Sequence, residues 1–137
     1  MKILIDTNVF LDAMMNRVPW AQAAQELLIA AAEEKVTGCV SANSFTDIYY
    51  ILRKHLQDKE KAKQALLQLL PSIEVLDING SDCEQALDMP LTDFEDALLA
   101  CNGKRHGVDY IVTRDKKHFD GSPVDAISPE EILKLIR

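Results

Sequence analysis

Long hydrophobic runs are absent from this sequence, which argues against a membrane-spanning or exported protein. The apolar opening ends at Asp6, too early for a signal peptide, and the apolar stretch of residues 27–32 is far shorter than the roughly 20 residues that span a bilayer. We therefore expect a soluble, cytoplasmic protein with no membrane partner.

Cysteine and histidine are scarce, and neither is arranged as a metal site. The three cysteines Cys39, Cys83 and Cys101 form no CxxC pair and no Cys/His spacing of the kind that binds zinc. An odd number of cysteines without a secretory signal fits a reducing compartment. We expect these side chains to be buried or half-buried, and we expect the histidines, each beside a lysine or arginine, at the surface.

Basic residues are in the minority, with 15 against 22 acidic residues and a net charge of −7. Tight non-specific binding of nucleic acid normally uses a basic surface, so this balance counts against it. The objection weakens if several of the acids share bound cations, because the cations then cancel local charge.

The 137 residues suit one domain with a sizeable core, and 47% hydrophobic with 27% charged residues is an ordinary globular composition. No internal repeat, low-complexity tract or linker interrupts the chain. We therefore treat residues 1–137 as a single domain.

Hydrophobic periodicity and capping signals predict strands that alternate with helices. Predicted strands cover residues 2–5, 37–40, 73–76, 110–112 and, as a fifth candidate, 124–127. Predicted helices cover residues 9–15, 19–35, a segment that Ser41 or Asn43 caps, 59–70, 81–87, 92–106 (with a capping box at 92–95 and Gly107 after its end), and a terminal segment that opens at Pro129. This alternation predicts an α/β fold whose mostly parallel central sheet is covered by helices.

Acidic residues from four segments are predicted to meet at one edge of this sheet. Asp6 and Asp115 follow the first and fourth predicted strands, so both lie at the carboxyl edge, where open α/β sheets bind ligands. Asp47 lies near the start of the helix that leaves the second strand at that edge. The sixth predicted helix starts at the same edge, because it leads back to the amino end of the fourth strand, and it carries Asp93 and Asp96 three positions apart.

Each of these acids, taken singly, also has a structural interpretation as a helix cap, a partner of a helix dipole or an exposed residue. Those roles do not explain the convergence, since clustered carboxylates repel and raise one another's pKa unless a cation neutralises them. A hard divalent cation with oxygen ligands removes the repulsion, and no histidine or cysteine is placed to favour zinc.

Several blocks of the chain, in this order and at this separation, resemble PIN domains. They are residues 5–8 (IDTN), residues 93–100 (DFEDALLA), and residues 110–115 (YIVTRD) followed by Phe119. Residues 44–50 (SFTDIYY) resemble the region that carries the second acid of the family. The resemblance extends over nearly the whole chain.

The resemblance implies a three-layer α/β/α sandwich and cleavage of RNA that depends on Mg²⁺ or Mn²⁺. Carried over residue by residue, it implies catalytic acids Asp6, Asp47, Asp96 and Asp115, metal ligands Asp6, Asp93, Asp96 and Asp115, and supporting polar residues Asn8 and Thr113. Many relatives have glutamate where this chain has Asp47, so the shorter side chain puts that assignment in doubt.

Basic residues beside the predicted site are candidates for contact with the RNA backbone. Arg114, Lys116 and Lys117 flank Asp115, although solvated surface charge explains them equally well. A second basic stretch in residues 53–63 could also follow a long RNA strand.

Many PIN domains of this size resemble VapC-type toxins, and that likeness implies a homodimer inhibited by a small antitoxin protein. A PIN nuclease without an antitoxin is a close alternative. A metal-dependent phosphatase with an aspartate nucleophile is a second one, disfavoured because Asn8 stands where a second aspartate is expected. The third alternative is a non-catalytic PIN-like interaction module, which has no need of mutually repelling carboxylates.

Overall fold

Five parallel strands form the central sheet of the computed structural model, which describes all of residues 1–137. The strands lie in the order β3-β2-β1-β4-β5. Their bounds are β1 Lys2–Ile5, β2 Thr37–Ser41, β3 Ile73–Leu76, β4 Tyr110–Val112 and β5 Ala126–Ile127. The predicted parallel sheet is confirmed, and the fifth candidate strand exists as a two-residue edge strand paired with β4.

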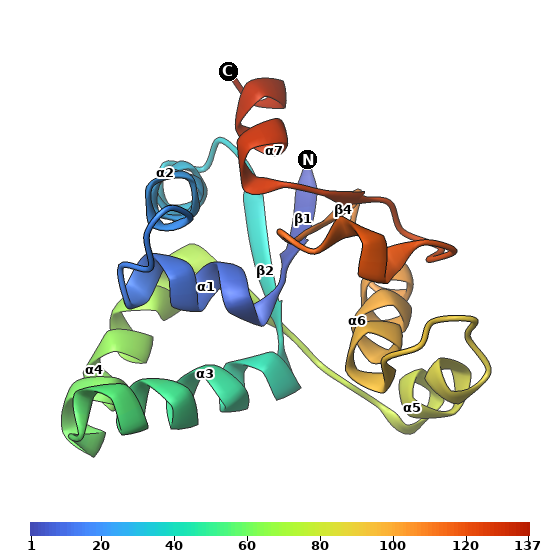
Figure 1. The fold of residues 1–137 in the computed structure, drawn as a ribbon, viewed down its shortest axis with the longest axis horizontal. Coiled ribbons are helices and arrows are strands. Elements are labelled where there is room, and N and C mark those ends of the chain that lie inside the picture. The colour runs from blue at the N-terminus through green and yellow to red at the C-terminus, as the bar shows by residue number, and fades with distance from the viewer.

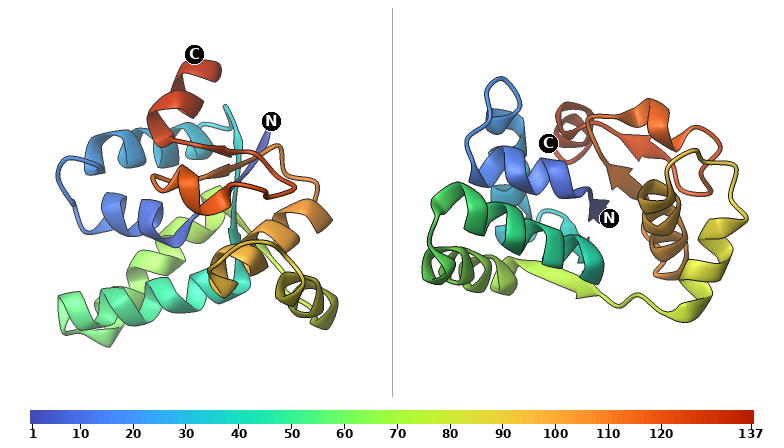
Figure 2. Two further views of the ribbon diagram at one scale, coloured as in Figure 1. Left: turned by 45° about the vertical axis from the view of Figure 1, so that its right-hand side comes forward. Right: turned by 60° about the horizontal axis from the view of Figure 1, so that its bottom comes forward.

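Helices cover both faces of the sheet, as Figures 1 and 2 show. They are α1 Thr7–Met14, α2 Ala21–Ala32, α3 Ala42–Leu56, α4 Lys59–Leu69, α5 Gly80–Leu87, α6 Phe94–Arg105 and α7 Pro129–Leu135, with short 3₁₀ turns η1 at Leu70–Ser72 and η2 at Lys116–Phe119. Helices α1 to α4 and α7 lie on one side of the sheet, and α5 and α6 lie on the other. The three-layer α/β/α sandwich is therefore confirmed.

The alternation of side chains along β1 explains why both faces are covered. Ile3 and Ile5 join a core of 21 buried residues on the side of α1 to α4, whereas Leu4 joins a core of nine on the side of α6. Successive strand residues point to opposite faces, so a wholly apolar strand needs a cover on each.

Some element boundaries differ from the predictions. The helix predicted to begin at Pro19 begins at Ala21 and ends at Ala32, before Glu34, whose φ of 60° no right-handed helix contains. The first helix begins at Thr7 rather than residue 9, because the extended backbone of Asp6 places it at the N-cap.

The predicted capping box at residues 92–95 is wrong. Asp93, not Thr92, is the N-cap of α6, and its Oδ1 accepts hydrogen bonds from the backbone N–H groups of Glu95 and Asp96 at 2.7 and 3.3 Å. An aspartate at that position caps a helix at least as well as the threonine before it, so the helix starts one residue later. Gly107, with φ of 68°, follows the end of α6 as predicted.

None of the helices combines the length and apolar character needed to cross a membrane. All three cysteines are free; Cys39 and Cys101 are buried and Cys83 is half-buried, as predicted.

Candidate active site

The first part of the site lies where β1 and β4 end side by side. The Asp6 N–H donates to the carbonyl of Val112 at 2.9 Å, so Asp6 continues the ladder one residue beyond β1. The hydroxyl of Thr113, which is fully buried, donates to Asp6 Oδ2 at 2.9 Å. The same oxygen of Thr113 accepts the backbone N–H of Asp115 at 3.1 Å. Thr113 thus links the two acids that follow neighbouring strands.

The second part comes from the start of α6. Asp93 caps the helix and Asp96 occupies its first turn. The helix start carries partial positive charge, so carboxylates are favoured there. These two acids nevertheless line the same cleft as Asp6 and Asp115, so their negative charges repel one another.

Burial and the charges of neighbouring carboxylates perturb the pKa values of Asp6 and Asp96. Burial, and after it the charges of Asp93, Asp6 and Asp115, raise the pKa of Asp96 to about 6, and His118 opposes this rise. Burial also raises the pKa of Asp6, against the hydrogen bonds from Thr113 and the backbone of Thr7. Asp6, Asp93, Asp96 and Asp115 are therefore close enough for their charges to repel one another.

Helix α3 supplies the third part. It starts where β2 ends, and Figure 1 shows the starts of α1, α3 and α6 gathered near the same end of the sheet. Between them lies an open cleft of about 430 Å³. Its lining residues are Asp6, Thr7, Asn8, Asn43, Ser44, Asp47, Ile51, Asp93, Glu95, Asp96, Leu99, Asp115 and His118. Asp47 is half-buried in this cleft.

The predicted carboxyl edge therefore brings together all five predicted acids and Asn8, with Thr113 buried beneath them. Sequence reasoning missed Glu95 and His118. The sequence does contain a signal for His118, because it lies three residues after Asp115. The one-turn helix η2 reverses the chain there and brings His118 back to the cleft. Its Nδ1 lies 3.6 Å from Asp96 Oδ2, and its side chain is 63% exposed.

The predicted RNA-contacting residues have mixed surroundings. Lys116 pairs with Glu131 at 2.7 Å, whereas Lys117 is exposed and makes no ion pair. The Nε and Nη2 of Arg114 lie 3.0 and 3.3 Å from the two carboxylate oxygens of Asp12, and its guanidinium lies 3.8 Å from the ring centroid of Trp20. Arg114 is thus held against the protein.

Asp12 is a third residue that the sequence analysis did not identify. It lies on α1 and is 1% exposed, and besides Arg114 it pairs with Arg17 at 3.5 Å. Arg17 also donates to Asn8 Oδ1 at 3.5 Å. Buried carboxylates persist only when paired. Asp12 therefore links the two sides of the cleft, because Arg17 contacts Asn8 and Arg114 directly precedes Asp115.

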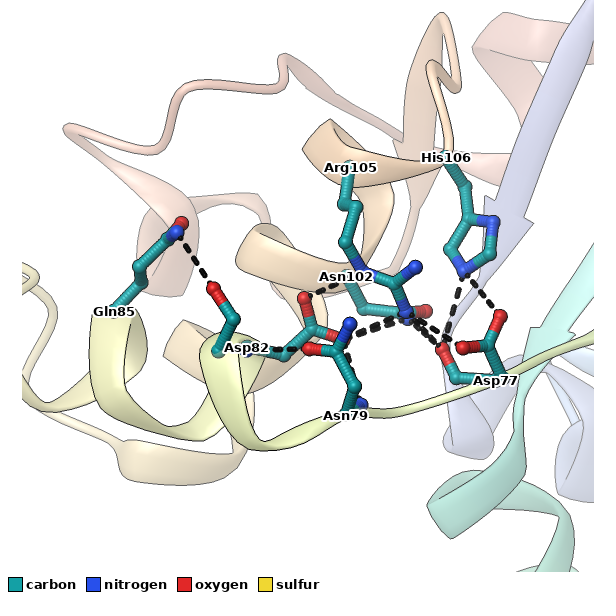
Figure 3. A network of polar contacts seen from close by, with 8 residues as sticks. Asp77, Asn79, Asp82, Gln85, Asn102, Arg105 and His106 are labelled. Carbon is teal, nitrogen blue, oxygen red and sulfur yellow. Dashed lines mark hydrogen bonds and ion pairs between the residues drawn. The ribbon is translucent and has the colours of Figure 1, made fainter.

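A further polar network anchors the far end of α6 (Figure 3). The buried carboxylate of Asp82 accepts from Arg105 Nε and Nη2 at 2.9 and 3.0 Å. Asn102 donates to the Asp77 carbonyl at 2.7 Å, and His106 Nε2 lies 3.2 Å from Asp77 Oδ1. Burial raises the pKa of Asp82, but its hydrogen bonds outweigh burial and lower the pKa overall. The network holds Asp77, in the segment between β3 and α5, and Asp82, on α5, against the end of α6.

The donor set of the cleft suits a hard cation, since all its side-chain donors except the His118 imidazole are carboxylate, hydroxyl and amide groups that offer oxygen. As the side chains stand, no group of three or more acids, histidines or cysteines is arranged to hold one ion. Mg²⁺ needs fewer, because it keeps several waters and is usually bound by one or two carboxylates plus a substrate phosphate. The residues therefore fit a hydrated divalent ion rather than one enclosed by protein ligands.

The chain matches the model of the PIN-domain family over residues 2–117. No curated protein sequence matches it significantly. It is similar to DNA-bound VapBC from Salmonella typhimurium (TM-score 0.71, 17% identity, over 94% of this chain and 98% of that one). It is also similar to a toxin–antitoxin complex from Klebsiella pneumoniae (0.67, 19%, over 93% and 97%) and to VapC20, a sarcin–ricin loop cleaving toxin from Mycobacterium tuberculosis (0.62, 15%, over 80% and 86%). At these identities the likeness to solved structures shows the shared fold.

Proposed function

Because this chain belongs to the PIN-domain family, we propose that it is a ribonuclease that hydrolyses phosphodiester bonds of RNA with one or two divalent cations. One observation carries the proposal. Acids from the end of β1, from α3, from the start of α6 and from the segment after β4 line a single open cleft, and burial together with the charges of neighbouring acids raises the pKa of Asp96 to about 6. A protein gains nothing in stability from such mutual repulsion, so the arrangement favours a cation-binding role.

One or two carboxylates among Asp6, Asp96 and Asp115 would hold a hydrated Mg²⁺ or Mn²⁺, with Asp93 and Asp47 at the sides of the cleft. A bound divalent cation supplies polarisation of a phosphoryl oxygen and a lower pKa for a bound water. The chain's own part is to hold these carboxylates in place. Thr113 does so for Asp6 and, through the N–H of Asp115, for the loop after β4.

Proton transfer is the second task of the chain. A group acts best as a general base when its pKa lies near the working pH. In the metal-free protein the pKa of Asp96 is about 6, so Asp96 would suit the removal of a proton from an attacking water if Asp6 and Asp115 hold the cation. Asn8 faces the same cleft and would orient the water or the substrate phosphate.

We further propose that RNA is cut as part of a toxin–antitoxin pair. Two similar solved structures are VapBC or toxin–antitoxin complexes, and a third is a toxin described as cleaving the sarcin–ricin loop. For this chain, we infer a homodimer and a small antitoxin that covers the acidic cleft. Co-purification of the chain with the product of a neighbouring reading frame, together with suppression of cleavage by that product, tests this part separately.

The cleavage test uses a panel of structured and single-stranded RNAs with Mn²⁺, Mg²⁺ or EDTA. We expect metal-dependent cleavage by the wild-type protein and a loss of about a hundred-fold or more in Asp6→Asn. Asp120→Asn is the matched control, because Asp120 is exposed and outside the cleft. Full metal-dependent activity in Asp6→Asn would refute the assignment.

The same proteins separate a nuclease from a non-catalytic interaction module. A cation that binds only the folded state raises the melting temperature. We expect Mn²⁺ to stabilise the wild-type and Asp120→Asn proteins and to have a much smaller effect on Asp6→Asn. Absence of both cleavage and a Mn²⁺ effect would favour the interaction module.

A further inference from the structure

A basic pocket lies at the far end of α3, beyond the acidic cleft. Six residues line this open depression of about 560 Å³: Tyr50, Arg53, Lys54, Gln57, Asp58 and Lys59. We propose that this α3–α4 pocket is a second RNA-binding subsite, which holds the single strand that continues out of the acidic cleft. This inference rests on the proposed ribonuclease function. It identifies the surface on which this acidic protein would bind the RNA backbone.

The charge of the chain is strongly segregated around this pocket. Residues 53–63 hold five of the 15 lysines and arginines and two of the 22 acids, a net charge of +3, so the rest of the chain carries −10. Of these two acids, Asp58 is already used, since its Oδ1 caps α4 by accepting from the N–H groups of Glu60 and Lys61. The pocket is therefore the natural place for phosphates on an otherwise acidic molecule.

The cations of the pocket are free to bind a ligand. Arg53, Lys54 and Lys59 are all exposed, and none of them takes part in an ion pair. Arg114 and Lys116, beside the acidic site, are by contrast already paired with Asp12 and Glu131. Beside Asp115 only Lys117 is free, whereas three free cations gather where α3 turns into α4.

One stripe of α3 connects the two sites. Asp47 and Ile51 line the acidic cleft, and Tyr50 and Lys54 line the basic pocket. Positions three and four apart are neighbours on a helix surface, so the stripe from Asp47 through Ile51 to Lys54 is continuous. It covers about 10 Å at 1.5 Å per residue, or about three nucleotide steps of a stacked strand. Figure 1 shows α3 running from the carboxyl end of β2 outward to the turn into α4.

Tyr50 adds a stacking surface between the two sites. Its side chain is 59% exposed, and its ring meets that of Tyr49 edge-on, with centroids 5.1 Å apart and an interplanar angle of 84°. Tyr49 packs against the core, so the Tyr50 ring has a buried aromatic neighbour on one edge while most of its surface is open to a ligand. An exposed aromatic ring among cations is the usual arrangement for binding single strands without sequence preference.

Binding is measured first, without cleavage. The probe is a labelled oligouridine of about 12 nucleotides, a length within the site sizes of single-strand binders. It is titrated in EDTA with Asp6→Asn protein over a series of salt concentrations. Adding Arg53→Glu and Lys54→Glu should weaken binding about ten-fold or more and reduce the slope of log K against log salt by about 1.4, since each phosphate contact contributes about 0.7. The control pair is Lys104→Glu with Lys134→Glu, which changes net charge equally at exposed positions outside both sites.

The tyrosine gives an uncharged version of the test. Tyr50→Ala should weaken binding roughly ten-fold with an unchanged salt slope, and Tyr50→Phe should bind as the parent does. In cleavage-competent protein, the Arg53→Glu, Lys54→Glu pair should raise KM for long RNA at constant kcat. It should leave unchanged the KM for RNA that ends within about three nucleotides of the scissile bond.

The outcomes separate this inference from the ribonuclease proposal. If the pocket variants lose EDTA-resistant binding but no RNA is ever cut, the subsite stands and only the catalytic proposal fails. If the control pair weakens binding as much as the pocket pair, or the salt slope does not change, the subsite is refuted. Unchanged RNA binding with loss of self-association in light scattering would show that the pocket contacts another copy of the chain, and would also overturn the inference.

Discussion

Replacing Asp96 with asparagine should make the metal-free protein more stable at neutral pH, although Asp96 lies in the proposed catalytic cleft. The reason is the crowding of charge. Burial and the charges of Asp93, Asp6 and Asp115 raise the pKa of Asp96 from 3.8 to about 6, and His118 only partly compensates. A carboxyl group with a raised pKa destabilises the folded state whenever it is ionised.

The magnitude follows from this pKa. The difference between 3.8 and about 6 corresponds to about 3 kcal/mol of unfavourable free energy once the group is ionised. The Asp96 side chain keeps 17% of its surface exposed, so solvent screening reduces the cost, and we expect about 1–2 kcal/mol. For a chain of this length, the melting temperature should rise by about 3–8 °C.

The stability gained by Asp96→Asn depends on pH. Between the unfolded pKa of 3.8 and the folded pKa of about 6, the folded state binds more protons, so Asp96 makes stability fall as pH rises through this window. The advantage of Asp96→Asn should thus be complete above about pH 6, shrink between pH 6 and pH 4, and vanish below that.

The assay is thermal unfolding of wild-type, Asp96→Asn and Asp120→Asn proteins from pH 4 to pH 8, in EDTA and again in Mn²⁺. Taking differences from the wild type removes the contribution of the titrating groups that do not interact with Asp96. Mn²⁺ should reduce or reverse the difference in stability between Asp96→Asn and the wild type. A cation at 100 times its Kd adds about 2.7 kcal/mol to the stability of a protein that binds it. A difference between wild type and Asp96→Asn that is the same at pH 4 and pH 8 would refute the reasoning.

Two further predictions concern stability. Asp12→Asn leaves the guanidinium groups of Arg17 and Arg114 without their buried partner, so urea denaturation should show a loss of about 3–5 kcal/mol. Glu33→Gln, which breaks the exposed pair with Lys35, should cost less than about 1 kcal/mol, and equal losses would contradict the assigned role of Asp12. Gly38→Ala should cost about 1–3 kcal/mol at an unchanged m value, because the added methyl would lie 3.0 Å from Ile73 Cδ1 and 3.1 Å from Ala31 Cβ. Gly80→Ala, with nothing within 4 Å of the new Cβ, is its control, and a Gly38→Ala protein as stable as this control would refute the packing argument.

Local pattern alone determined the fold class and most of the candidate site. The strand of residues 2–5 ends at Asp6 because an apolar run gives way to a charged residue, and the same signal places Asp115 after β4. In a parallel sheet those ends must share an edge, so the meeting of Asp6, Asp96 and Asp115 in one cleft follows from the order of elements. Helix starts were less determined, as Asp93 in place of Thr92 shows, because two adjacent residues both cap well.

Only the tertiary structure decided which side chains meet across long separations. Arg114 looked free for RNA beside Asp115, yet it is bound to Asp12, a residue 102 positions away. The link of Arg105 to Asp82, and the return of His118 toward Asp96, are likewise set by the packing of α5 and η2 against α6. Hydrophobic periodicity tells which face of an element is buried, but it carries no information on which polar groups that burial brings together. Those pairings depend on strand order and helix packing, which the whole chain determines at once.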